Sequence, residues 1–414
     1  SGPVIEMAWA RLDAVGIPDG PPLVVLPDGP GGSGLAEADQ WLGSPLREGR
    51  EIVLVDPRGT GRSFPSLDCG QPPRPGALPL DLVEDCRRSL LAQGVRLDAY
   101  DTAAIAADIA DLAAALGLRR IDVLGVGHGA KAALTVLRNH PQVLHALVLD
   151  SPVPLEVDLY ADRPANGQAA LNRLLDECVQ QPACRRAFGD LLPESETLII
   201  ELDDSPAQVE AGVQITGADL VLAALAAMRG ANGPGLIPTA MADAVVGFPD
   251  VALRRLQDAA IAGAAVPTSQ FSEGLRLSAD CREEVPFSDA DPDGGAEGLG
   301  SVGRAVAADV ADLLAACAIW DVGQAEDYVN QPVEGDVPTL VLTGEFDPLS
   351  PPSWGAGIAS RLEDAHVVQV GGAGHRVHDI DACTLDLVAG FLAAPARAVD
   401  GSCAADRSVQ FVLP

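Results

Sequence analysis

The sequence predicts an α/β fold in which a mostly parallel, twisted sheet is flanked by helices and carries an inserted, mainly helical lid. Short β-branched runs alternate with Ala/Leu-rich helical stretches, which is the pattern of strand-crossover-strand units. From about residue 155 to residue 335 strand-like runs become scarce, so this segment is predicted to lie over the strand ends as a lid. We therefore expect a core in two parts, residues 1–154 and 336–414, with a lid formed by residues 155–335.

Short apolar runs are predicted as the strands of the core, with a helix between the second and the third. The helix begins at the cap candidates Asp101 and Thr102 and ends at Gly117. Its apolar residues at positions 105, 109, 112 and 116 fall on one helical stripe. Within the lid, the polar and Gly-rich stretch Ser288–Ser301 is predicted to be a loop. The predicted strands are Leu23–Leu26, Ile52–Val55, Ile121–Leu124, Ala146–Leu149, Thr339–Leu342 and Val367–Val370.

The charge of the chain restricts its partners. The 414 residues include 27 Lys and Arg against 59 Asp and Glu, a formal net charge of −32. Nucleic acids and anionic membranes are held by cationic surfaces, so neither is expected as a partner. No stretch of the sequence is long and apolar enough to predict a transmembrane helix. The expected partner is a small-molecule or short-peptide substrate, and the oligomeric state is left open.

Eight cysteines indicate an exported protein with disulfides. None is in a C-x-x-C arrangement, and no Cys/His cluster has zinc-finger spacing, so we expect no metal. Eight reduced core thiols are the alternative. The chain opens with Ser1-Gly2 where an initiator Met is expected, which is compatible with a removed leader. Local pairs suggest themselves, although the sequence leaves the connectivity open: Cys69 with Cys86, Cys178 with Cys184, Cys281 with Cys317, and Cys383 with Cys403.

The stretch 124–130, Leu-Gly-Val-Gly-His-Gly-Ala, follows a predicted strand and begins a predicted helix. In a nucleophile elbow, G-x-S-x-G, small flanking residues allow a strained turn that exposes the central side chain above the sheet. Gly125 and Gly129 fit that frame, but the central residue is Gly127 and not serine. The backbone N–H of His128, the residue after the nucleophile position, is the expected oxyanion donor.

Two Gly-rich turns follow the first two predicted strands. The first is Pro27–Gly34, in which Gly29 is expected to offer a second backbone N–H to an oxyanion. Its Asp28 is either a solvated, inert carboxylate, a group that repels an oxyanion, or an acid/base partner of a histidine. The second turn is Asp56–Ser63. Neither has the spacing of a nucleotide-binding loop, so no nucleotide cofactor is expected.

An acid and a histidine follow the last two predicted strands. Asp347 lies in Gly344-Glu345-Phe346-Asp347-Pro348, and His375 ends the run Gly371-Gly372-Ala373-Gly374-His375. Arrival on neighbouring strand ends suits a carboxylate that orients an imidazole. The chain order of elbow, Asp and His is that of α/β-hydrolases.

With these motifs the chain resembles the secreted α/β-hydrolases related to tripeptidyl aminopeptidases and proline iminopeptidases, including their C-terminal segment. The resemblance runs from about Leu23 to Cys403 and implies an α/β-hydrolase fold and an exported serine exopeptidase. It implies Asp347 and His375 as two members of the triad, and the lid acids Glu283 and Glu284 as candidate contacts for a substrate amine. The chain departs from that pattern at Gly127, where the family has its serine, and at Asp28, where the family usually has glycine.

Three hypotheses follow from the missing serine. The first is a non-covalent acid/base enzyme, a cyclase, lyase, isomerase or water-activating hydrolase, that uses Asp347 and His375. The second is a serine aminopeptidase with an engineered Ser-to-Gly change at position 127, and the third is a pseudoenzyme that binds ligands without chemistry. No cofactor is expected: His378 lacks further metal ligands at suitable spacing, and Lys131 is interpreted as a surface or packing residue of the helix after the elbow.

Overall fold

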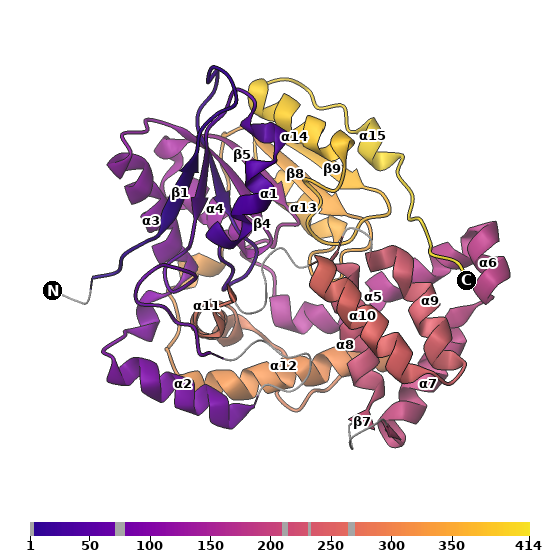
Figure 1. Ribbon diagram of the computed structural model, residues 1–414. Helices are drawn as coiled ribbons and strands as arrows, with labels where there is room; N and C mark the ends of the chain where they lie inside the picture. Colours follow the sequence, from indigo (N-terminus) through magenta and orange to yellow (C-terminus); the bar gives the residue numbers. More distant parts are fainter. Residues whose placement is uncertain (1–3, 71–78, 209–213, 231–232, 264–269) are drawn as a thin grey trace.

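A seven-stranded sheet forms the centre of the protein, in the strand order β1-β3-β2-β4-β5-β8-β9. In the computed structural model, which describes residues 4–70, 79–208, 214–230, 233–263 and 270–414, β1 pairs antiparallel with β3 and the other neighbours pair in parallel (Figure 1). The predicted, mostly parallel α/β sheet is confirmed. The strands are β1 (Trp9–Leu12), β2 (Leu23–Leu26), β3 (Ile52–Val55), β4 (Ile121–Val126), β5 (Leu144–Asp150), β8 (Thr339–Gly344) and β9 (Ala365–Val370).

The strands differ from the prediction mainly at their ends. β4 and β8 each continue through a glycine, Gly125 and Gly344, which strand propensity alone disfavours. Backbone atoms of Gly129 and Ala130 in α4 approach Gly125, and those of Ala373 and Gly374 after β9 approach Gly344, so a side chain at either position would clash. Edge strand β1 is not predicted at all, because it has no β-branched residue and is only half-buried.

Side chains on the two faces of the sheet belong to two separate apolar clusters. On β2, Val24 and Leu26 lie in one cluster, and Leu23 and Val25 lie in the other. Because both faces are covered, the central strands are apolar throughout, as is typical of parallel sheets. Helices α3 (Thr102–Ala115), α4 (His128–Asn139) and α13 (Pro352–Ala359) contribute to the first cluster, and α1 (Ala38–Leu42) and α14 (Ala382–Ala393) contribute to the second.

Helix α3 is the helix predicted between the second and third strands. Its N-cap Asp101 accepts a hydrogen bond from Ala104 N, and Gly117 follows its end with a φ of +69°. Ile105, Ile109 and Leu112 are buried against the sheet. This prediction is confirmed from cap to cap.

Between β5 and β8 the chain forms helices and the two-stranded ribbon β6 (Ala207–Gln208) and β7 (Gln214–Ile215). Helices α5, α7, α8, α9 and α10 gather beside the core, while α11 and α12 run beneath it, with α12 next to α2 (Leu80–Ala92) (Figure 1). Residues 288–300 form turns and irregular backbone before α12, so that loop is confirmed. The helices are α5 (Leu159–Gln180), α6 (Pro182–Phe188), α7 (Leu191–Asp204), α8 (Gly217–Met228), α9 (Gly233–Val245), α10 (Pro249–Gly263), α11 (Glu273–Glu283) and α12 (Ser301–Trp320).

The C-terminal segment crosses from the sheet to these helices. Val409 is buried in the apolar cluster of α5, α8 and α9. Val412 N donates to Gly235 O at 2.9 Å, and Thr239 Oγ1 donates to Val412 O at 2.5 Å. The end of the chain therefore ties α9 to the core.

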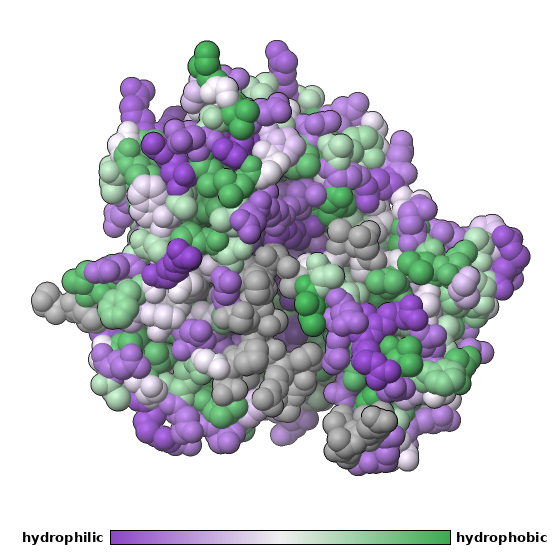
Figure 2. Space-filling view, in the orientation of Figure 1, coloured by the Kyte–Doolittle hydropathy of each residue, from purple (hydrophilic) through white to green (hydrophobic). Residues whose placement is uncertain are grey.

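Four disulfides join the pairs Cys69–Cys86, Cys178–Cys184, Cys281–Cys317 and Cys383–Cys403. The local pairing suggested by the sequence is confirmed, and the reduced-thiol alternative is wrong. The third disulfide joins α11 to α12, and the fourth joins α14 to the short helix α15 (Ser402–Ala405). Polar and apolar side chains are interspersed over the face shown in Figure 2. Among the described residues, no helix has the length and apolar character that crossing a membrane requires.

Candidate active site

The turn from β4 into α4 has the geometry of a nucleophile elbow. Gly127 sits at its apex with φ +52° and ψ −113°, a conformation that side chains rarely adopt, and Gly127 N donates to Asp150 O at 2.9 Å. A Cβ at Gly125 would overlap Gly129 O, and a Cβ at Gly129 would overlap Leu26 O. The flanking glycines are therefore required by close backbone packing, as the motif predicts.

Asp347 and His375 meet above this turn. Asp347 follows β8 and His375 follows β9, and His375 Nδ1 lies 2.7 Å from Asp347 Oδ2, across a sequence separation of 28 residues. Asp347 is held in place by Leu349 N, which donates to Oδ1 at 2.8 Å, and by Ser350 Oγ, which donates to Oδ2 at 2.7 Å. Both members of the pair are buried. This contact is the one that fixes the tautomer and orientation of an imidazole base.

The other ring nitrogen of His375 faces the elbow. Its Nε2 lies 3.4 Å from Asp28 Oδ2, and a Cβ at position 127 would lie 3.0 Å from it. Within the described part of the chain, no group makes a hydrogen bond of good geometry to this buried nitrogen. An unpaired buried nitrogen in a native site calls for an explanation, and proton transfer to a ligand is one.

The Asp28 carboxylate fills the space that a side chain at position 127 would take. A Cβ built on Gly127 would overlap Asp28 Oδ1. Gly29 N donates to Oδ1 at 2.8 Å, and Arg229 Nη2 donates to Oδ2 at 2.7 Å. Asp28 is thus partly buried, hydrogen-bonded and next to His375, and which of the roles raised by the sequence it has stays a prediction.

The two predicted oxyanion donors are the backbone N–H groups of Gly29, which follows Asp28, and of His128, which follows Gly127. The N–H of Gly29 is engaged by Asp28 itself. His128 is the first residue of α4, where a backbone N–H has no acceptor within the helix. The His128 side chain turns away to Thr102, with Nε2 and Oγ1 3.0 Å apart. Burial, reinforced by the charge of Lys131, lowers the pKa of His128 to about 3, so this imidazole is neutral.

The charges around His375 favour its protonated form. Burial lowers the pKa of His375, but the carboxylates of Asp347 and Asp28 outweigh burial and raise it to about 10. Burial acts on Asp28 in the opposite direction and raises its pKa. The positive charges of His375 and Arg229 outweigh this effect of burial and hold the pKa of Asp28 well below its usual range. At neutral pH the resting site therefore contains an imidazolium between two carboxylates.

Replacing Asp28 by asparagine should lower the pKa of His375, because one of its two carboxylate partners loses its charge. The folded-state pKa of His375 lies above its unfolded value of about 6.5. Its contribution to stability is therefore complete below that value and is lost as the pH rises toward about 10. We expect NMR titration of the His375 ring to show the lower pKa in Asp28→Asn, and urea unfolding to show a smaller loss of stability between pH 7 and 10. Asp250→Asn, at an exposed pair on α10, is the control, and an unchanged His375 titration in Asp28→Asn would contradict the assignment.

Arg229 is the site residue that the sequence did not indicate. It follows the last residue of α8, and its side chain is 43% exposed. A cation at a helix C-terminus is favourable and common. A single arginine after an Ala-rich helix therefore carries no sign of a site.

Glu283 and Glu284 lie beside the elbow helix in contact with the protein. Thr102 donates to Glu283 twice, from N at 2.7 Å and from Oγ1 at 2.5 Å. Glu284 is paired with Lys131. All three ionisable side chains are buried, so Lys131 is not a surface residue, and a role of the two acids in ligand binding stays a prediction.

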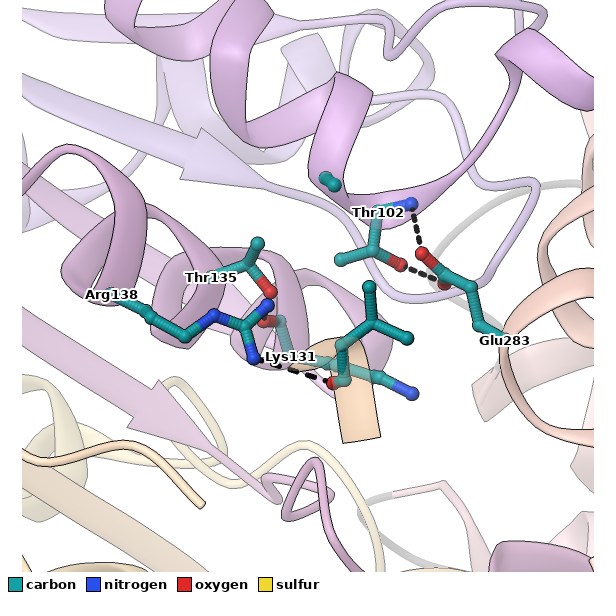
Figure 3. Close-up of a pocket in the computed structure, with 7 residues that line it drawn as sticks. Thr102, Lys131, Thr135, Arg138 and Glu283 are labelled. Atoms are coloured by element: carbon teal, nitrogen blue, oxygen red, sulfur yellow. Dashed lines mark hydrogen bonds between the residues drawn. The ribbon is translucent and has the colours of Figure 1, made fainter. Parts of the chain in front are cut away.

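A small pocket lies beside the contacts of Thr102 with Glu283 (Figure 3). Figure 3 shows the two hydrogen bonds from Thr102 to Glu283 and places Lys131 between Glu283 and Arg138. Arg138 Nη1 donates to the carbonyls of Tyr328 at 2.7 Å and Val329 at 3.4 Å. The pocket is lined by Thr102, Ala103, Lys131, Thr135, Arg138, Glu283 and Val329.

The second Gly-rich turn braces the first. Asp56 Oδ1 accepts from Ser33 Oγ at 2.6 Å, and Asp56 Oδ2 accepts from Arg62 N at 2.8 Å. Arg58 donates to Asp108 of α3 through Nε at 2.8 Å and Nη2 at 2.7 Å. These contacts give the turn a structural role that holds the Asp28 loop.

His378 is also held by the protein. Its Nδ1 lies 2.7 Å from Asp150 Oδ2, and its ring stacks on Trp41 with centroids 5.7 Å apart. Over the described ranges, no group of three or more His, Cys, Asp or Glu side chains has an arrangement that could hold a metal ion.

The parallel sheet, the elbow, and the acid and histidine on successive strand ends define an α/β-hydrolase fold. A family model described as "alpha/beta hydrolase fold" matches residues 21–196, and one described as "TAP-like protein" matches residues 303–403. These matches support an α/β-hydrolase of the TAP-like type.

Curated relatives and a solved structure are similar to the chain. The serine protease Hip1 of Mycobacterium tuberculosis is 24% identical, over 94% of this chain and 82% of its own length. The putative hydrolase YuaR of Escherichia coli is 24% identical, over 53% of this chain and 46% of its own length. Among solved structures, proline iminopeptidase of Mycobacterium smegmatis has a TM-score of 0.45 and 16% identity, and covers 95% of this chain and 96% of its own.

Proposed function

We propose that this protein is a non-covalent acid/base enzyme, a cyclase, lyase, isomerase or water-activating hydrolase, that works with Asp28, His375 and Asp347 in a lidded site. One observation carries the proposal. The Asp28 carboxylate takes the place of the missing nucleophile side chain and lies 3.4 Å from Nε2 of His375. Position 127 offers no oxygen for a covalent intermediate, whereas an acid and a base stand side by side.

The roles of the residues follow from their charges. His375 is protonated in the resting site, so its Nε2 acts as the general acid and donates a proton to the reacting group. Asp28 is ionised and lies beside His375, and we assign it as the general base for water, a substrate hydroxyl or a carbon acid, although its lowered pKa makes it a weak base in the resting site. Asp347 accepts a hydrogen bond from Nδ1 of His375, which keeps the proton on Nδ1 and orients the ring. The N–H of His128 is a donor for a developing negative charge.

The finer features of this proposal concern the ligand, the lid and the compartment. Hip1 is named a serine protease, which favours a short peptide or a related small molecule as the ligand. We propose residues 155–335 as the lid between the core segments 1–154 and 336–414. Four disulfides and the similarity to Hip1 support a secreted or otherwise extracytoplasmic protein.

The test compares the protein with His375→Ala on a panel of short peptides, esters and lactones, with products identified by mass spectrometry. We expect His375→Ala to lower turnover by about 10²–10⁴-fold, the usual range for a lost acid/base group. Asp28→Asn should lower turnover as well, and Asp250→Asn serves as the folded control. Mass spectrometry of the intact protein during turnover should detect no covalent adduct. Turnover that His375→Ala leaves unchanged, or an adduct that accumulates, would overturn the proposal.

A further inference from the structure

Arg229 joins the lid to the site through one hydrogen bond. Its Nη2 donates to Asp28 Oδ2 at 2.7 Å, and this same oxygen lies 3.4 Å from His375 Nε2. Within the described residues, Nη2 is the atom through which the guanidinium makes a side-chain hydrogen bond. The other four N–H donors of an arginine side chain remain for a ligand.

Arg229 is more exposed to solvent than Asp28 and His375. The side chain of Arg229 is 43% exposed, whereas that of Asp28 is 17% exposed and that of His375 is 3% exposed. The guanidinium is therefore the most accessible of these three groups. In a chain with a formal net charge of −32, an accessible cation beside the reactive groups is the feature that an anionic ligand would recognise.

Asp28 itself indicates which anion fits. Its carboxylate is held by Gly29 N on one oxygen and by Arg229 on the other, next to His375. If Arg229 is withdrawn, Asp28 keeps the Gly29 N–H and the neighbouring imidazolium. The guanidinium is a planar fork that matches a carboxylate through two parallel hydrogen bonds.

We propose that Arg229 binds a carboxylate group of the substrate, which replaces Asp28 as the partner of its guanidinium. This inference rests on the proposed function, because it takes the space over Gly127 as the reacting site. Withdrawal of Arg229 removes one of the cations that favour the ionised form of Asp28, so Asp28 becomes a stronger base when substrate is bound. Carboxylate recognition and activation of the base are then one event.

Acetate binding tests the proposal without requiring turnover. NMR titration of the His375 ring at constant ionic strength, with sodium chloride exchanged for sodium acetate, measures the affinity. Asp28→Asn removes the competing charge, so it should bind acetate at least ~10-fold more tightly than the unmodified protein. Acetamide, the neutral counterpart of acetate, should not bind.

Arg229 variants decide the outcome in the Asp28→Asn background. Arg229→Gln should abolish acetate binding, Arg229→Lys should leave weaker binding, and Arg254→Gln, at the exposed pair on α10, should change nothing. The proposal is overturned if Asp28→Asn binds no acetate, or if folded Arg229→Gln and Arg229→Lys both bind it as well as their parent. Acetate binding is measured without turnover, so the two proposals can fail separately. If acetate does not bind, the loss of turnover in His375→Ala still supports the proposed function. If His375→Ala keeps full turnover, acetate binding to Arg229 is still established.

Discussion

The double variant Gly127→Ser/Asp28→Gly should hydrolyse an activated ester such as p-nitrophenyl butyrate, whereas Gly127→Ser alone should remain nearly inactive. The reason is steric and electrostatic. A Cβ at position 127 would overlap Asp28 Oδ1, so a serine there meets a carboxylate in the place of its own side chain. Glycine at position 28 removes that carboxylate and also frees the N–H of Gly29 for an oxyanion.

The expected gain is large, because the remaining parts of a serine triad are in place. Asp347 already orients the His375 ring, and because Nε2 would lie only 3.0 Å from the new Cβ, the ring needs a shift of a few tenths of an ångström to face the serine hydroxyl. Loss of the serine of a triad costs about 10⁶-fold in turnover, so a partial recovery of ~10³-fold over the single variant is a modest expectation. Serine in this left-handed conformation adds strain of about 1–3 kcal/mol, which thermal unfolding of both variants would measure.

The control adds His375→Ala to the double variant, and this should remove the gained activity. If Gly127→Ser alone were as active as the double variant, Asp28 would be an incidental neighbour. The protein would then be a serine hydrolase whose nucleophile has been replaced, which is the second hypothesis from the sequence. Reading the natural codon at position 127 would then tell an engineered change from a natural one.

The sequence predicts the elbow and the meeting of Asp347 with His375, but not the other side-chain contacts of the site. Parallel strands bring their carboxyl ends to one edge of the sheet, so an acid after β8 and a histidine after β9 are expected to meet, and they do at 2.7 Å. The elbow is predictable for a similar reason, since only glycine fits at positions 125 and 129. Both inferences need only the order of the strands and the backbone.

Contacts between side chains from distant segments cannot be predicted from strand order and backbone alone. The sequence marks Asp28 as an unusual residue for its position. It does not show that the Asp28 carboxylate occupies the space above Gly127, because the two residues lie 99 positions apart in the chain. Arg229 reaches Asp28 across 201 residues, and no local pattern marks it. Lys131 lies in a stretch of α4 in which every residue from 129 to 137 is buried. A lysine, however, is most often found at a protein surface, so its residue type alone suggests an exposed position. Its partner Glu284 directly follows α11, far from Lys131 in the sequence.

Replacing Lys131 by methionine should destabilise the protein by about 3–5 kcal/mol, the cost of leaving one member of a buried ion pair without its partner. Lys131 is 5% exposed and Glu284 is 8% exposed, so water cannot replace the lost contact. Methionine keeps the length and apolar stem of lysine, which limits the effect to the lost charge. The measurement is the free energy of unfolding from urea titration at pH 7.

The loss should be smaller at pH 5 than at pH 7. Burial raises the pKa of Glu283, and the charge of Lys131 opposes that rise in the unmodified protein. Without Lys131 the pKa of Glu283 rises further. A carboxyl group whose folded-state pKa lies above its unfolded value destabilises the fold as the pH rises above the unfolded value, and protonation at lower pH relieves this.

Two further variants separate the ion pair from general damage to the helix. Lys131→Met/Glu284→Met replaces the whole pair by apolar side chains and should recover most of the lost stability, since buried pairs exchanged for well-packed apolar groups often cost little. Arg88→Met, at an exposed cluster with Glu84 and Asp85, should leave stability nearly unchanged. A double variant as unstable as Lys131→Met would contradict the ion-pair account. Because Lys131 lies on the elbow helix and Glu284 at the end of α11, recovery in the double variant would show that this contact between α4 and α11 stabilises the fold through paired charge and tolerates an apolar replacement.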